Sequence, residues 1–165
     1  MEHEFISGRG AQKNIHNVFS SLSYEKEYCE GIDDWEQNIP NTEFTIIHPK
    51  TIVNKVTSPD VGMEYSANPY QGCEHGCVYC YARNSHQYWG YSAGLDFESK
   101  ILVKLNSPKL FREFISKKNW TGSTISLSGN TDCYQPIERK FKLTQAILKI
   151  ALEYGQPIGI ITKNS

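Results

Sequence analysis

Three cysteines crowd into one short stretch near the middle of the chain. Cys73, Cys77 and Cys80 stand in the run GCEHGCVYCY, which covers residues 72–81. Thiolates at this spacing can converge on one soft metal centre. They are one ligand short of the four that a closed zinc site or a fully ligated cubane cluster requires. The trio therefore predicts a [4Fe–4S] cluster with one iron open to a ligand that is not protein.

A zinc site is the alternative that the cysteine spacing leaves open. His75 or Cys133 would then supply the fourth ligand, and the domain would be a zinc-stabilised binding module instead of an enzyme. The chain has five cysteines, an odd number, and no secretory signal precedes them. Metal binding or catalysis is therefore favoured over a disulfide framework, and a reducing, cytoplasmic location is expected.

Composition limits the partners. The chain has 165 residues, which suffices for one domain with one core. Its formal net charge of −1 provides no overall attraction for nucleic acid or an anionic membrane, although a local basic groove stays open. No apolar run approaches the ~20 residues of a membrane-spanning helix, so no membrane association is expected.

Alternating strands and helices are predicted from about residue 64 onward. Runs rich in apolar residues predict strands, and apolar residues at helical spacing predict helices. The expected strands are 65–69, 100–105, 124–128 and 157–163, and the expected helices are 81–88, one beginning at Ser107-Pro108, and 136–154 with Gly155 as its C-terminal cap. This alternation is typical of an α/β fold with a parallel sheet of βα units. The strand at 157–163 is apolar enough to be buried on both faces.

The two ends of the chain carry weaker patterns. Residues 1–60 are polar without sustained periodicity, and we expect an irregular N-terminal extension that wraps around the core, with a short turn or strand near Val53 and Val56. The chain ends just past a predicted strand, whose edge needs a neighbour. We therefore expect residues 61–165 to be the first part of a longer domain; a small complete α/β domain is the alternative.

The cysteine run resembles the radical S-adenosylmethionine superfamily motif C-x3-C-x-aromatic-C, with Tyr79 at the aromatic position. Its surroundings resemble the branch related to spore photoproduct lyase, whose members are mostly described as DNA repair photolyase-like. The runs that carry this resemblance are 8–12, 58–60, 68–83, 94–98, 130–139 and 162–163. The resemblance implies a partial (β/α)6 TIM-like barrel, of which this chain would supply the extension and about three strands.

The resemblance also implies the chemistry and the cofactors. Cys73, Cys77 and Cys80 would ligate three irons of the cluster, and S-adenosylmethionine would chelate the fourth. An electron delivered by a donor such as flavodoxin or ferredoxin would cleave the sulfonium, giving a 5′-deoxyadenosyl radical that abstracts hydrogen from the substrate. Repair of a DNA photolesion is the reaction suggested by this branch. A fragment that is inactive without the later strands is a further alternative.

Five residues are expected near the cofactor because of the resemblance. Tyr79 would pack beside the cluster and the adenine, and Thr131 and Asp132, with Asn130 next to them, would contact the cofactor from the end of a strand. Lys163 would contact the methionine carboxylate, since an ammonium supplies a point charge. Ordinary alternatives exist for three of them: a half-buried tyrosine at 79, a helix-capping carboxylate at 132, and a solvated surface charge at 163.

The remaining cysteines and one histidine carry less specific expectations. Cys133 is a candidate hydrogen-atom donor to the substrate radical, although the position that matches the family's donor is Gly129. The alternative for Cys133 is a small buried hydrophobic residue. Cys29 is flanked by carboxylates, which blunt thiol reactivity, and is assigned no role. His75 is expected either to hydrogen-bond a cluster sulfur or to serve as a turn residue.

Overall fold

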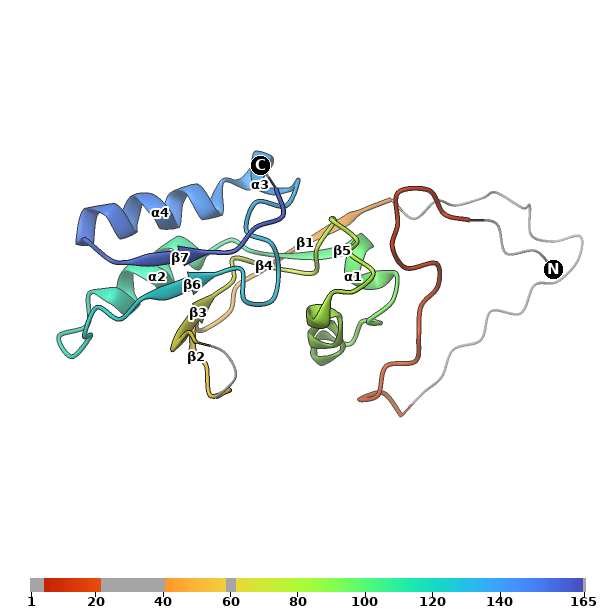
Figure 1. The fold of residues 1–165 in the computed structure, drawn as a ribbon, viewed down its shortest axis with the longest axis horizontal. Coiled ribbons are helices and arrows are strands. Elements are labelled where there is room, and N and C mark those ends of the chain that lie inside the picture. The colour runs from red at the N-terminus through yellow and green to blue at the C-terminus, as the bar shows by residue number, and fades with distance from the viewer. Residues whose placement is uncertain (1–4, 22–40, 59–61, 165) are drawn as a thin grey trace, which may run out of the picture.

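The chain folds into two small β-sheets and several helices, as a computed structural model shows for residues 5–21, 41–58 and 62–164 (Figure 1). Strands and helices alternate after residue 64, so the α/β prediction is confirmed. The elements are β1 (Glu43–Ile47), β2 (Val53–Lys55), β3 (Tyr65–Ala67), β4 (Tyr70–Gln71), η1 (Tyr81–Trp89), α1 (Asp96–Ser99), β5 (Lys100–Lys104), α2 (Ser107–Ile115), β6 (Ile125–Leu127), α3 (Glu138–Phe141), α4 (Leu143–Tyr154) and β7 (Ile158–Ile160).

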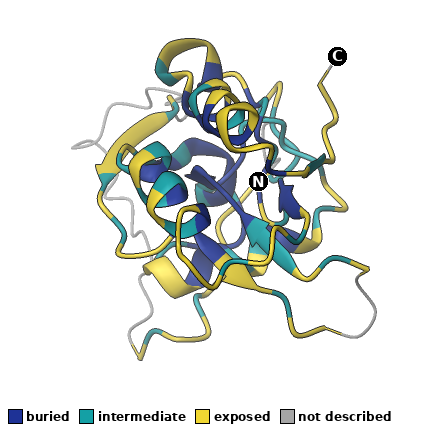
Figure 2. Cartoon of the chain, turned by 90° about the vertical axis from the view of Figure 1, so that its left-hand side faces the viewer, coloured by how far each residue is buried: buried dark blue, intermediate teal, exposed yellow. Residues whose placement is uncertain are grey.

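The four-stranded sheet runs in the order β2-β3-β6-β7. Strands β3, β6 and β7 are parallel, with Ala67 opposite Leu127 and Leu127 opposite Ile160, and β2 is antiparallel to β3. Helices α2 and α4 pack against this sheet through a cluster of buried side chains that includes Phe111, Ile125 and Ile147. Figure 2 shows the resulting division, with buried residues between the sheet and the inner helix faces. These parallel strands bring the ends of β6 and β7 to one edge.

The three-stranded sheet differs from the expectation. Its order is β1-β5-β4, with β5 parallel to β1 and antiparallel to β4. The predicted strand at 100–105 therefore does not continue the parallel sheet of β6 and β7, and the two sheets together are mixed. Strand β1 shows that residues 43–47 are not irregular, contrary to the prediction. Its side chains are mostly exposed, so the segment lacks the buried face that would mark a strand in the sequence.

The helices predicted for 81–88 and from Ser107 are present, the first as the 3-10 helix η1, whereas the short helix α1 was not predicted. Helix α2 begins at Ser107 with proline in its first turn, and α4 ends at Gly155, whose φ of 63° is left-handed, as expected. The single helix predicted for 136–154 is wrong, because Lys142 (φ 53°) separates α3 from α4. The carboxylate of Glu138 accepts the backbone N–H groups of Thr144 and Gln145, which caps the new helix start.

Strand β7 is shorter and more exposed than the sequence predicts. It spans Ile158–Ile160 at the edge of the four-stranded sheet, and Ile160 is 37% exposed. The prediction that this strand is buried on both faces is therefore wrong for the described residues. None of the helices in the described ranges is long and apolar enough to cross a bilayer.

Candidate metal centre

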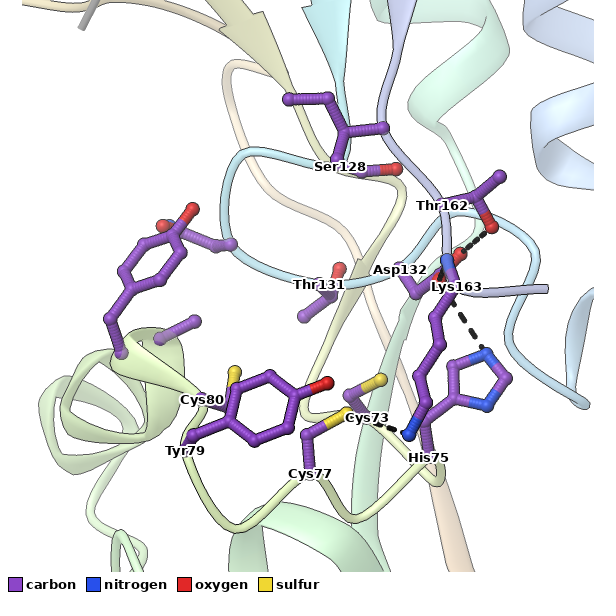
Figure 3. A pocket seen from close by; sticks show the side chains of 14 residues that line it. Cys73, His75, Cys77, Tyr79, Cys80, Ser128, Thr131, Asp132, Thr162 and Lys163 are labelled. Atoms are coloured by element: carbon purple, nitrogen blue, oxygen red, sulfur yellow. Dashed lines mark hydrogen bonds and ion pairs between the residues drawn. The ribbon is translucent and has the colours of Figure 1, made fainter.

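A pocket of about 380 Å³ brings three separate segments together (Figure 3). The cysteine loop, residues 72–80 between β4 and η1, forms one wall. The loop after β6 contributes residues from 128 to 132, and the chain just past β7 contributes 161–163. All the predicted cofactor and metal residues line this pocket: Cys73, Cys77, Tyr79, Cys80, Asn130, Thr131, Asp132 and Lys163. Cys133 is not among the residues that line it.

Two glycines give the cysteine loop its shape. Gly72 (φ 80°) and Gly76 (φ 59°) adopt left-handed conformations, which other residues rarely tolerate. The Cys73 backbone N–H then donates to the Phe97 carbonyl at 2.8 Å, which ties the loop to the following segment. The fully buried amide of Gln135 supports the loop from beneath by donating to the Gly72 carbonyl at 3.1 Å. These contacts hold the loop without any disulfide.

The three thiols face the same space. Figure 3 shows their sulfur atoms on the pocket side of the loop, and none of them forms a disulfide. Cys73 is 6% exposed, and burial raises the pKa of its thiol to about 11. Among the described residues, no three His, Cys, Asp or Glu side chains converge closely enough to hold a single metal ion. Three thiols that face one pocket are a donor set that either a zinc ion or a cubane cluster can use.

Lys163 lies against this thiol wall. Its ammonium Nζ is 3.4 Å from the Cys77 Sγ, and this hydrogen bond is the main cause that raises the pKa of Lys163. The side chain is exposed, as the surface-charge alternative expects, but it lines the pocket. Its contact with a methionine carboxylate stays a prediction.

Asp132 connects the segments of the pocket. One carboxylate oxygen accepts the Tyr134 backbone N–H at 2.9 Å and the Thr162 hydroxyl at 2.8 Å. The other accepts the Lys163 backbone N–H at 2.7 Å and lies 3.6 Å from the His75 Nε2. Asp132 thus fixes the chain past β7 onto the loop after β6. The alternative of a helix cap is wrong, since α3 begins only at Glu138 and has no side-chain cap.

The neighbours of Asp132 have different surroundings. Thr131 is 5% exposed, and its hydroxyl donates to the Tyr70 carbonyl at 3.2 Å, so it ties the loop after β6 to β4. Asn130 is exposed, and its backbone N–H donates to the Asn68 side chain at 2.9 Å. Thr131 and Asp132, the two residues predicted to touch the cofactor, therefore bond mainly to other residues of the protein. Their described contacts hold neighbouring segments in position.

Tyr79 and Cys133 end up in opposite environments. Tyr79 is 79% exposed at the pocket wall, so the alternative of a half-buried tyrosine is wrong. Cys133 is fully buried in the core under α4, and burial raises the pKa of its thiol. This position matches the small buried hydrophobic alternative and gives no route to a substrate in the pocket. Cys29 lies outside the described residues.

Several important residues escaped the sequence analysis. Ser128 and Thr162 also line the pocket. The fully buried Glu98 and its partly buried partner Arg83 lie directly behind the cysteine loop. Both charged residues fall in runs that carry the family resemblance, but no spacing pattern connects them. Their pairing depends on tertiary structure, which a single sequence does not display.

The comparisons with known proteins find relatives of similar sequence. The chain is 34% identical over 117 residues to "Uncharacterized protein Rv2578c" of Mycobacterium tuberculosis, a match that covers 70% of this chain and 34% of that protein. It is 36% identical over 122 residues to "Uncharacterized protein MJ0683" of Methanocaldococcus jannaschii, covering 74% of this chain and 43% of that protein. The chain thus spans less than half the length of these curated relatives. No family model matches the chain. No solved structure matches it either.

Proposed function

We propose that the chain is part of a radical S-adenosylmethionine enzyme of the photolyase-like branch, with a [4Fe–4S] cluster on Cys73, Cys77 and Cys80. One observation carries the proposal: three thiols, an ammonium and the loops after two parallel strands meet at one pocket. Ligand sites of α/β folds lie at the carboxyl ends of parallel strands. Strands β3, β6 and β7 would be the first three of a partial (β/α)6 barrel.

The residues of this pocket would have different roles. When bound, the cluster and S-adenosylmethionine would supply one-electron cleavage of the sulfonium bond and hydrogen abstraction from the substrate. Cys73, Cys77 and Cys80 would hold three irons as thiolates. Lys163 would attract the carboxylate of the methionine moiety, and Asp132 would keep the backbone of Lys163 in place. Tyr79, at the wall, would cover the site and limit the access of water.

The partners are proposed by the same reasoning. A flavodoxin or ferredoxin in the cytoplasm would deliver the electron. A photolesion in DNA is the substrate suggested by the resemblance, and the net charge of −1 neither attracts nor strongly repels that polyanion. Cys133 is not included as a hydrogen donor in this proposal, because it is fully buried in the core.

A zinc-stabilised module is the second candidate, and one observation favours it. The Nε2 atom of His75 is buried in the pocket wall without a hydrogen-bond partner among the described residues. A neutral imidazole in that position could complete a site of three thiolates and one histidine. This candidate requires the loop to contract around one ion, and it predicts a colourless protein that contains zinc and no iron.

Anaerobic reconstitution with iron and sulfide tests the proposal. The expected product is brown, absorbs near ~400 nm through thiolate–iron charge transfer, and releases 5′-deoxyadenosine when dithionite and S-adenosylmethionine are added. Replacing Cys77 by Ser should abolish iron binding, whereas Cys133→Ala is the matched control and should retain it. A protein that takes up zinc alone, or a loaded cluster that never yields 5′-deoxyadenosine, would contradict the proposal. A longer chain that releases the product where the present chain does not would identify an inactive fragment.

A further inference from the structure

The N-terminal arm, residues 6–19, lies along the segment 83–98 that follows the cysteine loop (red in Figure 1). Backbone and side-chain hydrogen bonds connect the two over their length. The Lys13 carbonyl accepts the Leu95 N–H at 3.2 Å, and the Ile15 N–H donates to the Ser92 hydroxyl at 2.8 Å. Near its end, the arm is held by the amide of Gln87, which accepts the Val18 N–H at 2.8 Å. The arm is therefore specifically docked.

Glu98 is the centre of this docking. Its side chain is fully buried, and its two carboxylate oxygens accept the backbone N–H groups of Gly10 at 2.9 Å and Ala11 at 2.8 Å. The guanidinium of Arg83 pairs with the same carboxylate, and Arg9 donates to the Glu98 carbonyl at 2.7 Å. A buried carboxylate is costly unless its oxygens are satisfied by such donors. The N-terminal arm thus supplies part of what keeps Glu98 in place.

Arg83 connects Glu98 to the cysteine loop. Its Nε and Nη2 atoms donate to the carbonyl of Cys77 at 3.1 and 3.0 Å, and its Nη1 donates to the Gly94 carbonyl at 3.2 Å. The planar guanidinium can serve the carbonyl and the carboxylate together because its donors form a rigid fork. The backbone of one predicted cluster ligand is therefore held by a side chain that is itself fixed by Glu98.

Two glycines make a second, steric contact between the arm and the loop. A Cβ atom at Gly10 would overlap the carbonyl oxygen of Gly76, so the two backbones touch directly. A Cβ at Gly76 would lie 2.8 Å from the Glu98 carboxylate, and the φ of 59° at Gly76 already excludes most side chains. The stretch between Cys73 and Cys77 is consequently enclosed between the arm and Glu98.

We infer that the N-terminal arm is a positioning element for the metal centre, and that Glu98 and Arg83 transmit its docking to the backbone of Cys77. The inference rests on the proposed function only in taking Cys77 as a metal ligand. Arg83, Glu98 and Gly10 are positioning residues, since none of them lines the pocket. Docking of the arm presets the spacing of the thiols before any metal binds.

Hydrogen exchange measured by mass spectrometry on the metal-free chain tests the coupling directly. Glu98→Gln and Gly10→Ala should each speed exchange of the loop amides by about tenfold, because a lost support lowers the local opening free energy. Exchange in α2 and α4 should not change. Gln12→Ala is the matched control, since the hydrogen bonds of Gln12 to described residues run to Ile6 and Arg9 of the arm, and it should leave the loop as in the wild type.

Arg83→Lys separates positioning from general stability. Lysine keeps the charge beside Glu98 but cannot donate to the Cys77 carbonyl from two nitrogens, so the loop should loosen while the arm stays protected. In reconstituted protein, Glu98→Gln and Arg83→Lys should also change the electron paramagnetic resonance signature of the reduced cluster. Faster exchange confined to the arm, or a uniform increase that includes α2 and α4, would overturn the inference. A wild type that binds no iron would refute the proposed function and leave the exchange result standing.

Discussion

The two halves of the described molecule are stabilised by different interactions. The half with β2, β3, β6 and β7 is covered by α2 and α4 and held by apolar packing around Phe111, Ile125 and Ile147. The cysteine half, with the cysteine loop, β4 and β5, has smaller apolar clusters and adds polar side chains, Glu98, Gln135 and Arg83, that bond to backbone atoms. Apolar packing is non-directional, whereas hydrogen bonds fix distances and angles. The first half thus provides stability, and the second fixes the geometry of the thiols.

Truncation of the apolar half should have the largest effect. Phe111 is fully buried between the four-stranded sheet and α4. Phe111→Ala should lower the free energy of unfolding by about 3–5 kcal/mol, from lost burial and the cavity that remains. Urea denaturation followed by circular dichroism measures it. Leu152→Ala on the exposed face of α4 is the control and should stay within about 0.5 kcal/mol of the wild type. Equal effects of the two substitutions would refute the assigned core.

Acid should destabilise the cysteine half through His86. Its ring is fully buried, stacks on Tyr91 at 5.1 Å and meets the edge of Phe97, and burial lowers the pKa of His86 to about 4. In the unfolded state, His86 takes up a proton below about pH 6.5, whereas in the folded state it stays neutral down to about pH 4. The stability that the neutral His86 ring contributes to the fold is fully present above pH 6.5 and is lost as the pH falls toward 4.

The substitution His86→Phe isolates this effect. Up to about 3 kcal/mol of stability should depend on His86 across that pH interval, from a pKa difference of about 2.5 units between 6.5 and about 4. The gap in unfolding free energy between the variant and the wild type should therefore shift in favour of the variant as the pH falls from 7 to 4.5. Parallel pH curves for the two proteins would show that His86 is not buried in its neutral form.

Loss of the Asp132 charge should have an intermediate effect at the junction of the halves. Asp132→Asn leaves one amide nitrogen facing the Lys163 backbone N–H, so at least one hydrogen bond is lost, at about 1–3 kcal/mol. Hydrogen exchange should rise in residues 158–164 more than in β6. The exposed Glu153→Gln, which breaks only the surface pair with Arg112, is the matched control. Unchanged protection of residues 158–164 would contradict the anchoring role of Asp132.

Removal of the Lys163 ammonium should have the smallest effect on folding. The side chain is exposed, so Lys163→Met should leave the unfolding transition unchanged. In cluster-loaded protein, it should weaken S-adenosylmethionine binding by about tenfold, as expected for one charge-assisted contact. Isothermal titration calorimetry measures the affinity. Lys149→Met on α4 is the control, and equal affinities of all three proteins would remove Lys163 from the site.

Local patterns in the sequence predicted the parts of the structure that depend on local chemistry. The positions of β3, β6 and α2, the glycine at the end of α4, and the convergence of the cysteines with Lys163 followed from spacing, turn residues and the family resemblance. Exposed β1 and the break at Lys142 did not. Strand β1 exists because β5 pairs with it, and the break exists because Glu138 caps α4. Strand β1 and the break at Lys142 both depend on contacts between separate elements, which the residue pattern of one element does not reveal.

The central claim is an iron–sulfur cluster with one iron available to S-adenosylmethionine. Mössbauer spectroscopy of anaerobically reconstituted protein tests it most directly, with and without that compound. The account predicts a cubane cluster in which one iron site changes its parameters on addition of S-adenosylmethionine, and no such cluster in the Cys77→Ser variant. A cluster whose iron sites all stay unchanged, or a protein that holds zinc and rejects iron, would contradict it.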